Sequence, residues 1–149
     1  MAKRDRAKSY ARKEAVKDET EAKGTDKIFL SFNLKHLDQT QPKNSPQTIA
    51  VWHDNDLLQS LVHRIMQVSQ LTRLEAVQQQ QLKIYGDFPP KDKTDFSHPA
   101  FVPENVYWGV LKHVGGQTGT VAGYIEDDVF NVVFFDKDHR FWITPKKHT

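Results

Sequence analysis

The sequence predicts an α+β fold in which two helices are followed by a C-terminal antiparallel β-meander. Apolar residues recur at helical spacing between Asp54 and Leu71. Three segments of alternating apolar residues follow between Val106 and Asp136, and short turn sequences separate them. Because connections this short join antiparallel neighbours, we expect the order β-α-α-β-β-β, with room for one further strand, and a sheet packed on the two helices.

The chain is predicted to form one domain between two tails. Its 149 residues are enough for a single hydrophobic core. Residues 1–25 carry eight basic and five acidic side chains but almost no large apolar residue, so we expect a basic tail that is disordered or only partly helical. The domain is then expected over residues 26–144, and residues 145–149 form a C-terminal tail.

The composition excludes several classes of protein. Cysteine is absent, so disulfides, thiolate nucleophiles and sulfur-based zinc sites are excluded. No apolar run reaches the roughly 20 residues of a membrane span, and no apolar segment follows the basic N-terminus. We therefore expect a cytoplasmic protein without a membrane partner. The glycines do not form the phosphate-binding or dinucleotide-binding patterns, and no cofactor is predicted.

The first half of the domain is predicted to contain a strand and a long helix. Large apolar residues alternate between Ile28 and Leu34, which is the period of a half-buried strand. The polar run over residues 38–48 contains two prolines and predicts a surface loop. The helix is expected over residues 54–71, with Asp54 or Asp56 as its N-cap.

A second helix and a long loop are predicted next. Thr72 and Glu75 have the spacing of a capping box, which predicts a helix over residues 73–82. Residues 86–104 are rich in proline and predict an irregular loop that is either functional or wrapped over the core. The predicted strands of the meander then occupy residues 106–114, 120–126 and 129–136, and residues 140–143 are a candidate for a short final strand.

The turn after the last long strand contains Asp136, Asp138 and His139. Two carboxylates and an imidazole are ligands for divalent metals, but three ligands within four residues rarely converge without others. The alternative is a charged turn in which Asp136 accepts hydrogen bonds from backbone amides. This alternative is favoured, and no metal site is predicted.

Arg140 and Trp142 follow in the same segment, and together with His139 they suggest an RNA-binding strand end. Arginine pairs with phosphate, and an aromatic ring stacks on a base. The alternative is an ordinary strand end with Trp142 packed on the core. His53 and His98 are further candidates for acid or base chemistry, although a structural role is more common for such histidines.

Aromatic residues gather around the predicted loop, and they include Phe101, Tyr107 and Trp108. One interpretation is that they close the core. The other is that they form a surface on which a partner docks. In that case the chain is a non-catalytic protein-interaction module that uses the aromatic loop and a sheet edge.

Three C-terminal runs carry a resemblance to a known family: YWGVL at residues 107–111, GTVAGY at 119–124 and DVFNVVFFDKDHRF at 128–141. In layout, with a strand and two helices before them, they resemble the sheet of RelE/ParE-like toxins. The resemblance implies a concave sheet face that acts on ribosome-bound mRNA or, in other members, inhibits gyrase. It also implies a cognate antitoxin that blocks the activity.

The resemblance assigns roles to residues by position. It implies catalysis by Tyr124, His139 and Arg140, which would activate the ribose hydroxyl and neutralise the phosphate charge. It places Lys112, His113 and Trp142 among the RNA-binding residues. Gly123 and Tyr124 stand where the family usually has an arginine on a middle strand.

The final run is also similar to small uncharacterised proteins of bacterial mobile elements. The leading hypothesis is therefore a toxin-like RNA-directed protein of a toxin-antitoxin or mobile-element system, either an endoribonuclease or an inactive relative. Its expected partners are the ribosome or mRNA and a cognate antitoxin. The alternative hypothesis is the protein-interaction module that docks a partner through Phe101, Tyr107 and Trp108.

Overall fold

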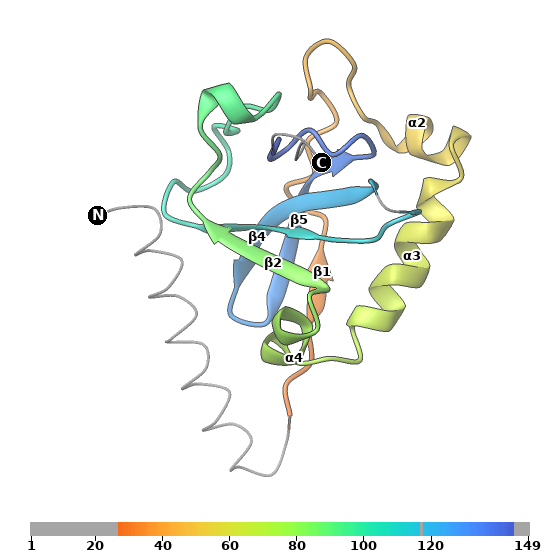
Figure 1. Cartoon of the computed structure of the whole chain (residues 1–149), viewed down its shortest axis with the longest axis vertical. Coiled ribbons are helices and arrows are strands. Elements are labelled where there is room, and N and C mark those ends of the chain that lie inside the picture. Colours follow the sequence, from red (N-terminus) through yellow and green to blue (C-terminus); the bar gives the residue numbers. More distant parts are fainter. Residues whose placement is uncertain (1–26, 117, 145–149) are drawn as a thin grey trace, which may run out of the picture.

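The structure is a computed structural model, which describes residues 27–116 and 118–144. The predicted tails at residues 1–25 and 145–149 lie outside the described residues. The described chain forms three α-helices and a five-stranded mixed sheet with strand order β1-β5-β4-β3-β2 (Figure 1). The α+β class and the C-terminal meander are thus confirmed. The elements are β1 (Ser31–Asn33), α2 (Ile49–Asp54), α3 (Leu57–Val68), α4 (Arg73–Gln78), β2 (Leu82–Gly86), the 3-10 turn η1 (Lys91–Lys93), β3 (Tyr107–Leu111), β4 (Thr120–Glu126) and β5 (Val129–Asp136).

The C-terminal meander consists of β3, β4 and β5, which pair antiparallel. β4 and β5 have the predicted bounds, and Glu126 pairs with Val129 across a two-residue turn. The first turn residue, Asp127, has a φ of 53°, a left-handed value that aspartate tolerates in tight turns. β3 is shorter than predicted and ends at Leu111, since the chain turns at His113 with a φ of 62°.

The predicted helix over residues 54–71 is wrong in its bounds, because the structure has two helices in this region. α2 begins earlier than predicted, where the Thr48 side chain accepts a hydrogen bond from a first-turn amide at 3.1 Å. α3 begins after Asp56, which has a left-handed backbone and makes no side-chain cap. The early start places Trp52 in the core, where it is fully buried. None of the described helices is long and apolar enough to cross a membrane.

The predicted capping box at the second helix is confirmed. The Thr72 amide donates to Glu75 Oε1 at 2.9 Å, and the Glu75 amide donates to Thr72 Oγ1 at 3.2 Å. The predicted end of this helix is wrong, because α4 stops at Gln78 and Gln80 turns the chain with a φ of 59°. Leu82 is then buried at the start of β2, an edge strand that the sequence analysis did not predict.

The first strand is shorter than the predicted range 28–34, and β1 pairs in parallel with β5. Its N-terminal approach lies beside the α3–α4 connection, where the Leu30 amide donates to the Leu71 carbonyl at 3.0 Å. The candidate strand over residues 140–143 does not form, since the chain after Asp136 is held in a turn and bends.

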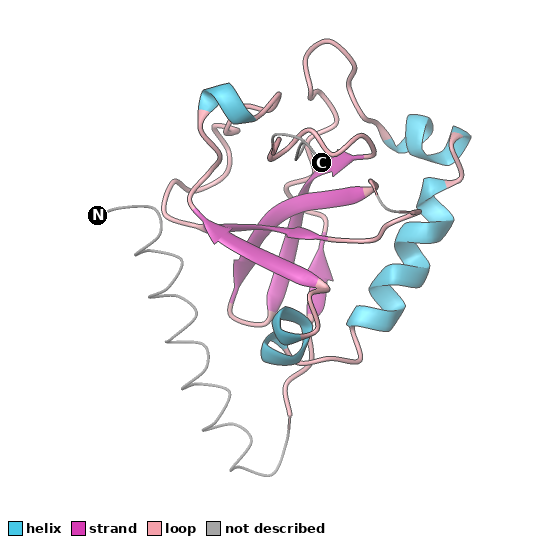
Figure 2. Ribbon diagram, in the orientation of Figure 1, coloured by secondary structure: helices cyan, strands magenta, loops and turns pink. Residues whose placement is uncertain are grey.

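The helix side of the sheet is covered by α2, α3 and α4. Figure 2 shows α2 and α3 along one side of the molecule and α4 at its lower end, with irregular chain and the short η1 turn on the opposite side. The core here is largely aliphatic, with the fully buried Trp52 stacked on Phe135 at 4.3 Å between ring centroids. The buried members of this core are Leu30, Trp52, Leu61, Val68, Ala76, Leu82, Leu111, Val114, Val121, Ile125, Phe130, Val132 and Phe135.

The loop side of the sheet is covered by irregular chain, mainly residues 87–106 and the segment after β5. Half of the buried residues in the core on this side are aromatic, and the Trp108 and Phe134 rings stack with centroids 6.0 Å apart. Its buried members are Phe96, Val102, Val106, Trp108, Val110, Ala122, Tyr124, Val133, Phe134 and Phe141. Of the two predicted roles for the long loop, wrapping over the core is confirmed.

Candidate functional site

The turn after β5 is organised by the buried carboxylate of Asp136. Its two oxygens accept hydrogen bonds from the Arg140 and Phe141 amides, each at 2.8 Å. Burial raises the pKa of Asp136, against the opposing effect of these amides. The charged-turn interpretation is therefore confirmed. Within the described ranges no three metal-ligating side chains form a group that could hold an ion.

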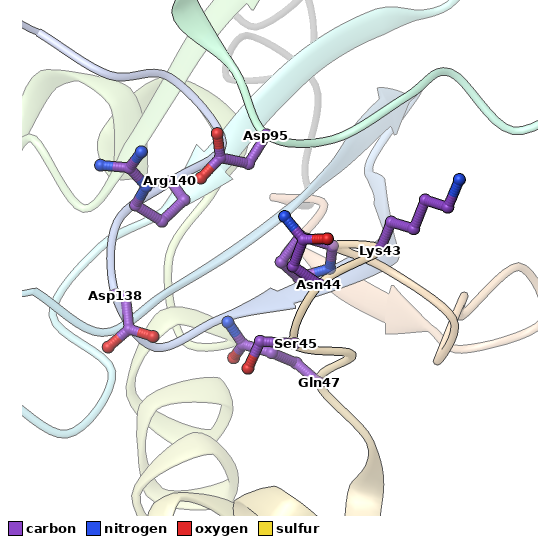
Figure 3. Close-up of a pocket in the computed structure, with 8 residues that line it drawn as sticks. Lys43, Asn44, Ser45, Gln47, Asp95, Asp138 and Arg140 are labelled. Carbon is purple, nitrogen blue, oxygen red and sulfur yellow. Dashed lines mark hydrogen bonds and ion pairs between the residues drawn. The ribbon is translucent and has the colours of Figure 1, made fainter.

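A polar pocket lies between this turn and the loop that precedes α2 (Figure 3). We call it the loop–turn pocket, and its volume is about 490 Å³. Three separate segments of the chain build it, so only the fold brings its residues together. The lining residues are Pro42, Lys43, Asn44, Ser45, Gln47, Asp95, Asp138 and Arg140.

Gln47 forms the fixed wall of the loop–turn pocket. Its side chain is buried, and Oε1 accepts hydrogen bonds from Trp52 Nε1 and from the Lys137 amide, each at 2.8 Å. Since both partners are donors, the amide cannot be flipped without losing both bonds. Nε2 makes no hydrogen bond to the described part of the chain, and Figure 3 shows the amide directed toward the space between Asn44 and Asp138.

Most charges that line the pocket already have an opposite partner. Arg140 Nε donates to Asp95 Oδ2 at 2.6 Å, and Lys137 Nζ lies 3.0 Å from Asp138 Oδ2. The hydrogen bond and charge of Asp95 raise the pKa of Arg140, which therefore stays charged. Lys43 is exposed and has no ion pair within residues 27–116 and 118–144. The pocket region thus has one unbalanced cation.

The loop that carries Gln47 is joined by Gln41 to the irregular chain over residues 87–106, which we call the aromatic loop. Gln41 Nε2 donates to the Ser97 carbonyl at 2.9 Å, and the Ser97 amide donates back to Gln41 Oε1 at 2.6 Å. The same Nε2 also donates to Asp38 at 3.0 Å. The Asp38 amide in turn donates to the carbonyl of Val133, the residue at the irregularity of β5, at 2.7 Å. The two loops therefore form one hydrogen-bonded unit anchored on the sheet.

A second surface lies where the aromatic loop meets the β1 edge, and we call Leu34, His36 and Phe101 the Phe101 surface. The Phe101 side chain is 50% exposed and Leu34 is 54% exposed. The His36 ring contacts Phe101, with centroids 5.7 Å apart. His36 Nδ1 is also hydrogen-bonded to the hydroxyl of Tyr124 at 2.7 Å. The exposed Phe101 ring thus packs on His36, which is itself hydrogen-bonded to the buried Tyr124.

The residues that the resemblance marks as catalytic do not share one site. Tyr124 is only 2% exposed, and its hydroxyl is used by His36. Burial and the charge of Glu126 raise the pKa of Tyr124. Arg140 follows the Asp136 end of β5, which pairs with Thr120. Tyr124 lies four residues further along β4 than Thr120, which is roughly 13 Å along the sheet. His139, with a φ of 59°, lies in the turn beside Arg140.

The remaining predicted residues are scattered over the sheet. His113 is exposed in the β3–β4 connection, and the Lys112 carbonyl accepts a hydrogen bond from Arg64 Nε at 2.8 Å. Trp142 stacks on Tyr85 beside β2, with centroids 4.2 Å apart. Among the predicted docking residues, Tyr107 packs toward the helix-side core and Trp108 is buried on the loop side. Only Phe101 presents a large exposed apolar surface.

Three residues of these two surfaces were not predicted from the sequence: Gln41, Gln47 and His36. No short motif marks them, because each acts through a partner far away in the sequence. The available signal for Gln47 is its place before the α2 cap, five residues ahead of the tryptophan that it bonds. Comparisons of the chain with protein-family models, curated proteins and solved structures found no match.

Proposed function

We propose that this chain is a non-catalytic interaction module that docks a protein partner on the Phe101 surface. The observation that carries the proposal is the half-exposed Phe101 ring in contact with the fixed His36, with Leu34 exposed two residues before His36 in the chain. Aromatic residues held in one position lose little entropy on binding and are the common energetic centres of protein interfaces. The partner is expected to present an apolar cavity for the Phe101 ring.

The charge near this surface indicates which charged groups the partner is expected to carry. Lys35 lies between Leu34 and His36, is exposed, and has no ion pair with the described residues. An acidic rim around the partner's apolar cavity would complement it and favour the correct orientation. This makes the proposed partner a protein with an apolar pocket and carboxylates at its edge.

The packing of the sheet favours docking over RNA cleavage. Both sides of the sheet carry a buried core, so Tyr124 lies beneath the aromatic loop rather than on an open face. General acid–base catalysis needs a group within hydrogen-bond reach of the substrate. The toxin hypothesis requires this loop to leave the sheet, whereas docking uses the surface as it stands.

The test compares two equally exposed apolar residues. A tagged chain is used to recover crosslinked partners from its source cells, as wild type, Phe101→Ser and Val62→Ser, since Val62 on α3 is 55% exposed. We expect one partner to crosslink to residues 34–36 or 101 and to be lost with Phe101→Ser only. Equal recovery with both variants, or crosslinks confined to other surfaces, would contradict the proposal.

The toxin hypothesis is tested with a second set of variants. Strong induction of the wild type, His139→Ala and Arg140→Ala chains is expected to leave growth and translated mRNA unchanged. Growth arrest with mRNA cleavage by the wild type, relieved by either alanine variant, would replace the docking proposal with the RNA-directed one.

A further inference from the structure

Gln47 is a buried residue whose amide nitrogen makes no hydrogen bond to the described chain and reaches the solvent of a preformed pocket. We propose that the loop–turn pocket binds a small polar molecule through an oxyanion group, a phosphate or a carboxylate, that accepts a hydrogen bond from Gln47 Nε2. This inference does not depend on the Phe101 surface. The two uses lie at different places on the loop side.

The amide of Gln47 is oriented by its own hydrogen bonds. Oε1 is held by Trp52 Nε1 and by the Lys137 amide, so the nitrogen is left on the pocket side. Nε2 is accessible in the pocket, where a ligand oxygen can replace water as the acceptor of its hydrogen bond. An oxyanion placed between Asn44 and Asp138 would satisfy it.

The remaining lining favours an acceptor-rich ligand. Asn44 and Ser45 supply an amide and a hydroxyl, and neither side chain makes a hydrogen bond to the described residues. Asp95 and Asp138 are each paired with a cation, so neither is free to attract a cationic ligand. Figure 3 shows Lys43 extended away from the pocket, so its charge attracts an anion without a fixed contact.

The pocket is built before any ligand arrives. On one side, the Gln47 amide donates to the Gln41 carbonyl and the Ser45 amide to the Pro42 carbonyl, both at 3.0 Å. On the other side, the buried carboxylate of Asp136 fixes the turn that carries Arg140. Walls held in this way need little ordering on binding. A volume of about 490 Å³ lies within the range of small-molecule sites, roughly 300–1,000 Å³.

The test follows the Gln47 side-chain amide by nuclear magnetic resonance during titration of the full chain with inorganic phosphate and, separately, with acetate. We expect saturable shifts of the Gln47 amide and of the Ser45 backbone amide for at least one anion. The anion that binds more tightly identifies the oxyanion. Absence of saturable shifts with both anions would overturn the proposal.

Two variants and one control make the test specific. Gln47→Glu keeps an oxygen for Trp52 and Lys137 but replaces the donor, so binding should weaken roughly tenfold or more. Lys43→Ala changes an exposed side chain and should weaken binding by about threefold, while Lys35→Ala outside the pocket should have no effect. Binding of the anion by Gln47→Glu as tightly as by wild type would overturn the proposal. If Gln47→Glu does not fold, the comparison of Lys43→Ala with Lys35→Ala replaces it, and equal affinity of these two variants and wild type would then show non-specific anion binding and overturn the proposal.

Discussion

Both sides of the sheet carry a buried core, but the chain covers the two cores by different means. On the helix side, regular helices place apolar side chains on the strands, and the backbone satisfies its own hydrogen bonds. On the loop side, the covering chain is irregular, so side chains must satisfy its backbone groups. Three side chains accept hydrogen bonds from backbone amides of this chain, namely Gln41, Gln47 and Asp136. Both proposed binding surfaces arise on this second side.

This difference explains why the loop side carries the candidate sites. The backbone polar groups of a helix bond to one another along its axis. A loop that is held in place by side-chain hydrogen bonds leaves some polar groups exposed at fixed positions. The Gln47 amide uses its oxygen for structure and presents its nitrogen to the pocket. Tyr124 likewise lies in the core and uses its hydroxyl to hold His36 beneath Phe101. The residues that hold the irregular chain on the sheet therefore also form the two proposed binding surfaces.

The largest effect is expected from a matched pair of core truncations on β5. Phe130 faces the helix-side core and Phe134 the loop-side core, and both are fully buried. We expect Phe130→Ala and Phe134→Ala each to lower the free energy of unfolding by about 3–5 kcal/mol, measured by urea denaturation. A cost for Phe134→Ala below about a third of that for Phe130→Ala would break the equivalence of the two sides and show that the aromatic loop is a loose cover.

A smaller, pH-dependent effect is expected from Tyr124→Phe. Removing the hydroxyl that bonds His36 should cost about 1 kcal/mol at neutral pH. The native pKa of Tyr124 is raised above its ordinary value of 10.0 by burial, so the unfolded chain releases this proton first as pH rises. The wild type therefore loses stability above about pH 10, and the variant lacks this loss.

The measurement for this variant is the difference in unfolding free energy between wild type and Tyr124→Phe at neutral pH and above pH 10. We expect the advantage of the wild type to shrink as pH rises. A constant difference over this range would show that the Tyr124 hydroxyl is accessible to water, contrary to the described burial.

The sequence predicted the meander well and the irregular elements poorly. β4 and β5 were found because alternating apolar residues and turn sequences are local signals. α2 was missed because the choice of residue 49 as its start depends on burying Trp52 against Phe135, a contact made across the chain. β2 was missed because a strand of five residues directly after a helix has no distinct period of its own.

The sites were predicted only in part. Arg140 and Phe101 were marked from their chemistry, and the structure places one in the loop–turn pocket and the other on an exposed surface. Gln47 has no such mark, because a glutamine becomes a directed donor only after Trp52 and the Lys137 amide have taken its oxygen. Long-range hydrogen bonds of this kind leave no pattern in one sequence.

The central claim is that the aromatic loop and the turn after β5 are fixed parts of the fold, because both binding surfaces rest on them. Native-state hydrogen exchange tests this at the Ser97 amide, which donates to Gln41, and at the Phe141 amide, which donates to Asp136. We predict that both are protected to within about 1–2 kcal/mol of the central amides of β4. Exchange of Ser97 and Phe141 near the rate of an unfolded chain, with β4 still protected, would contradict the claim.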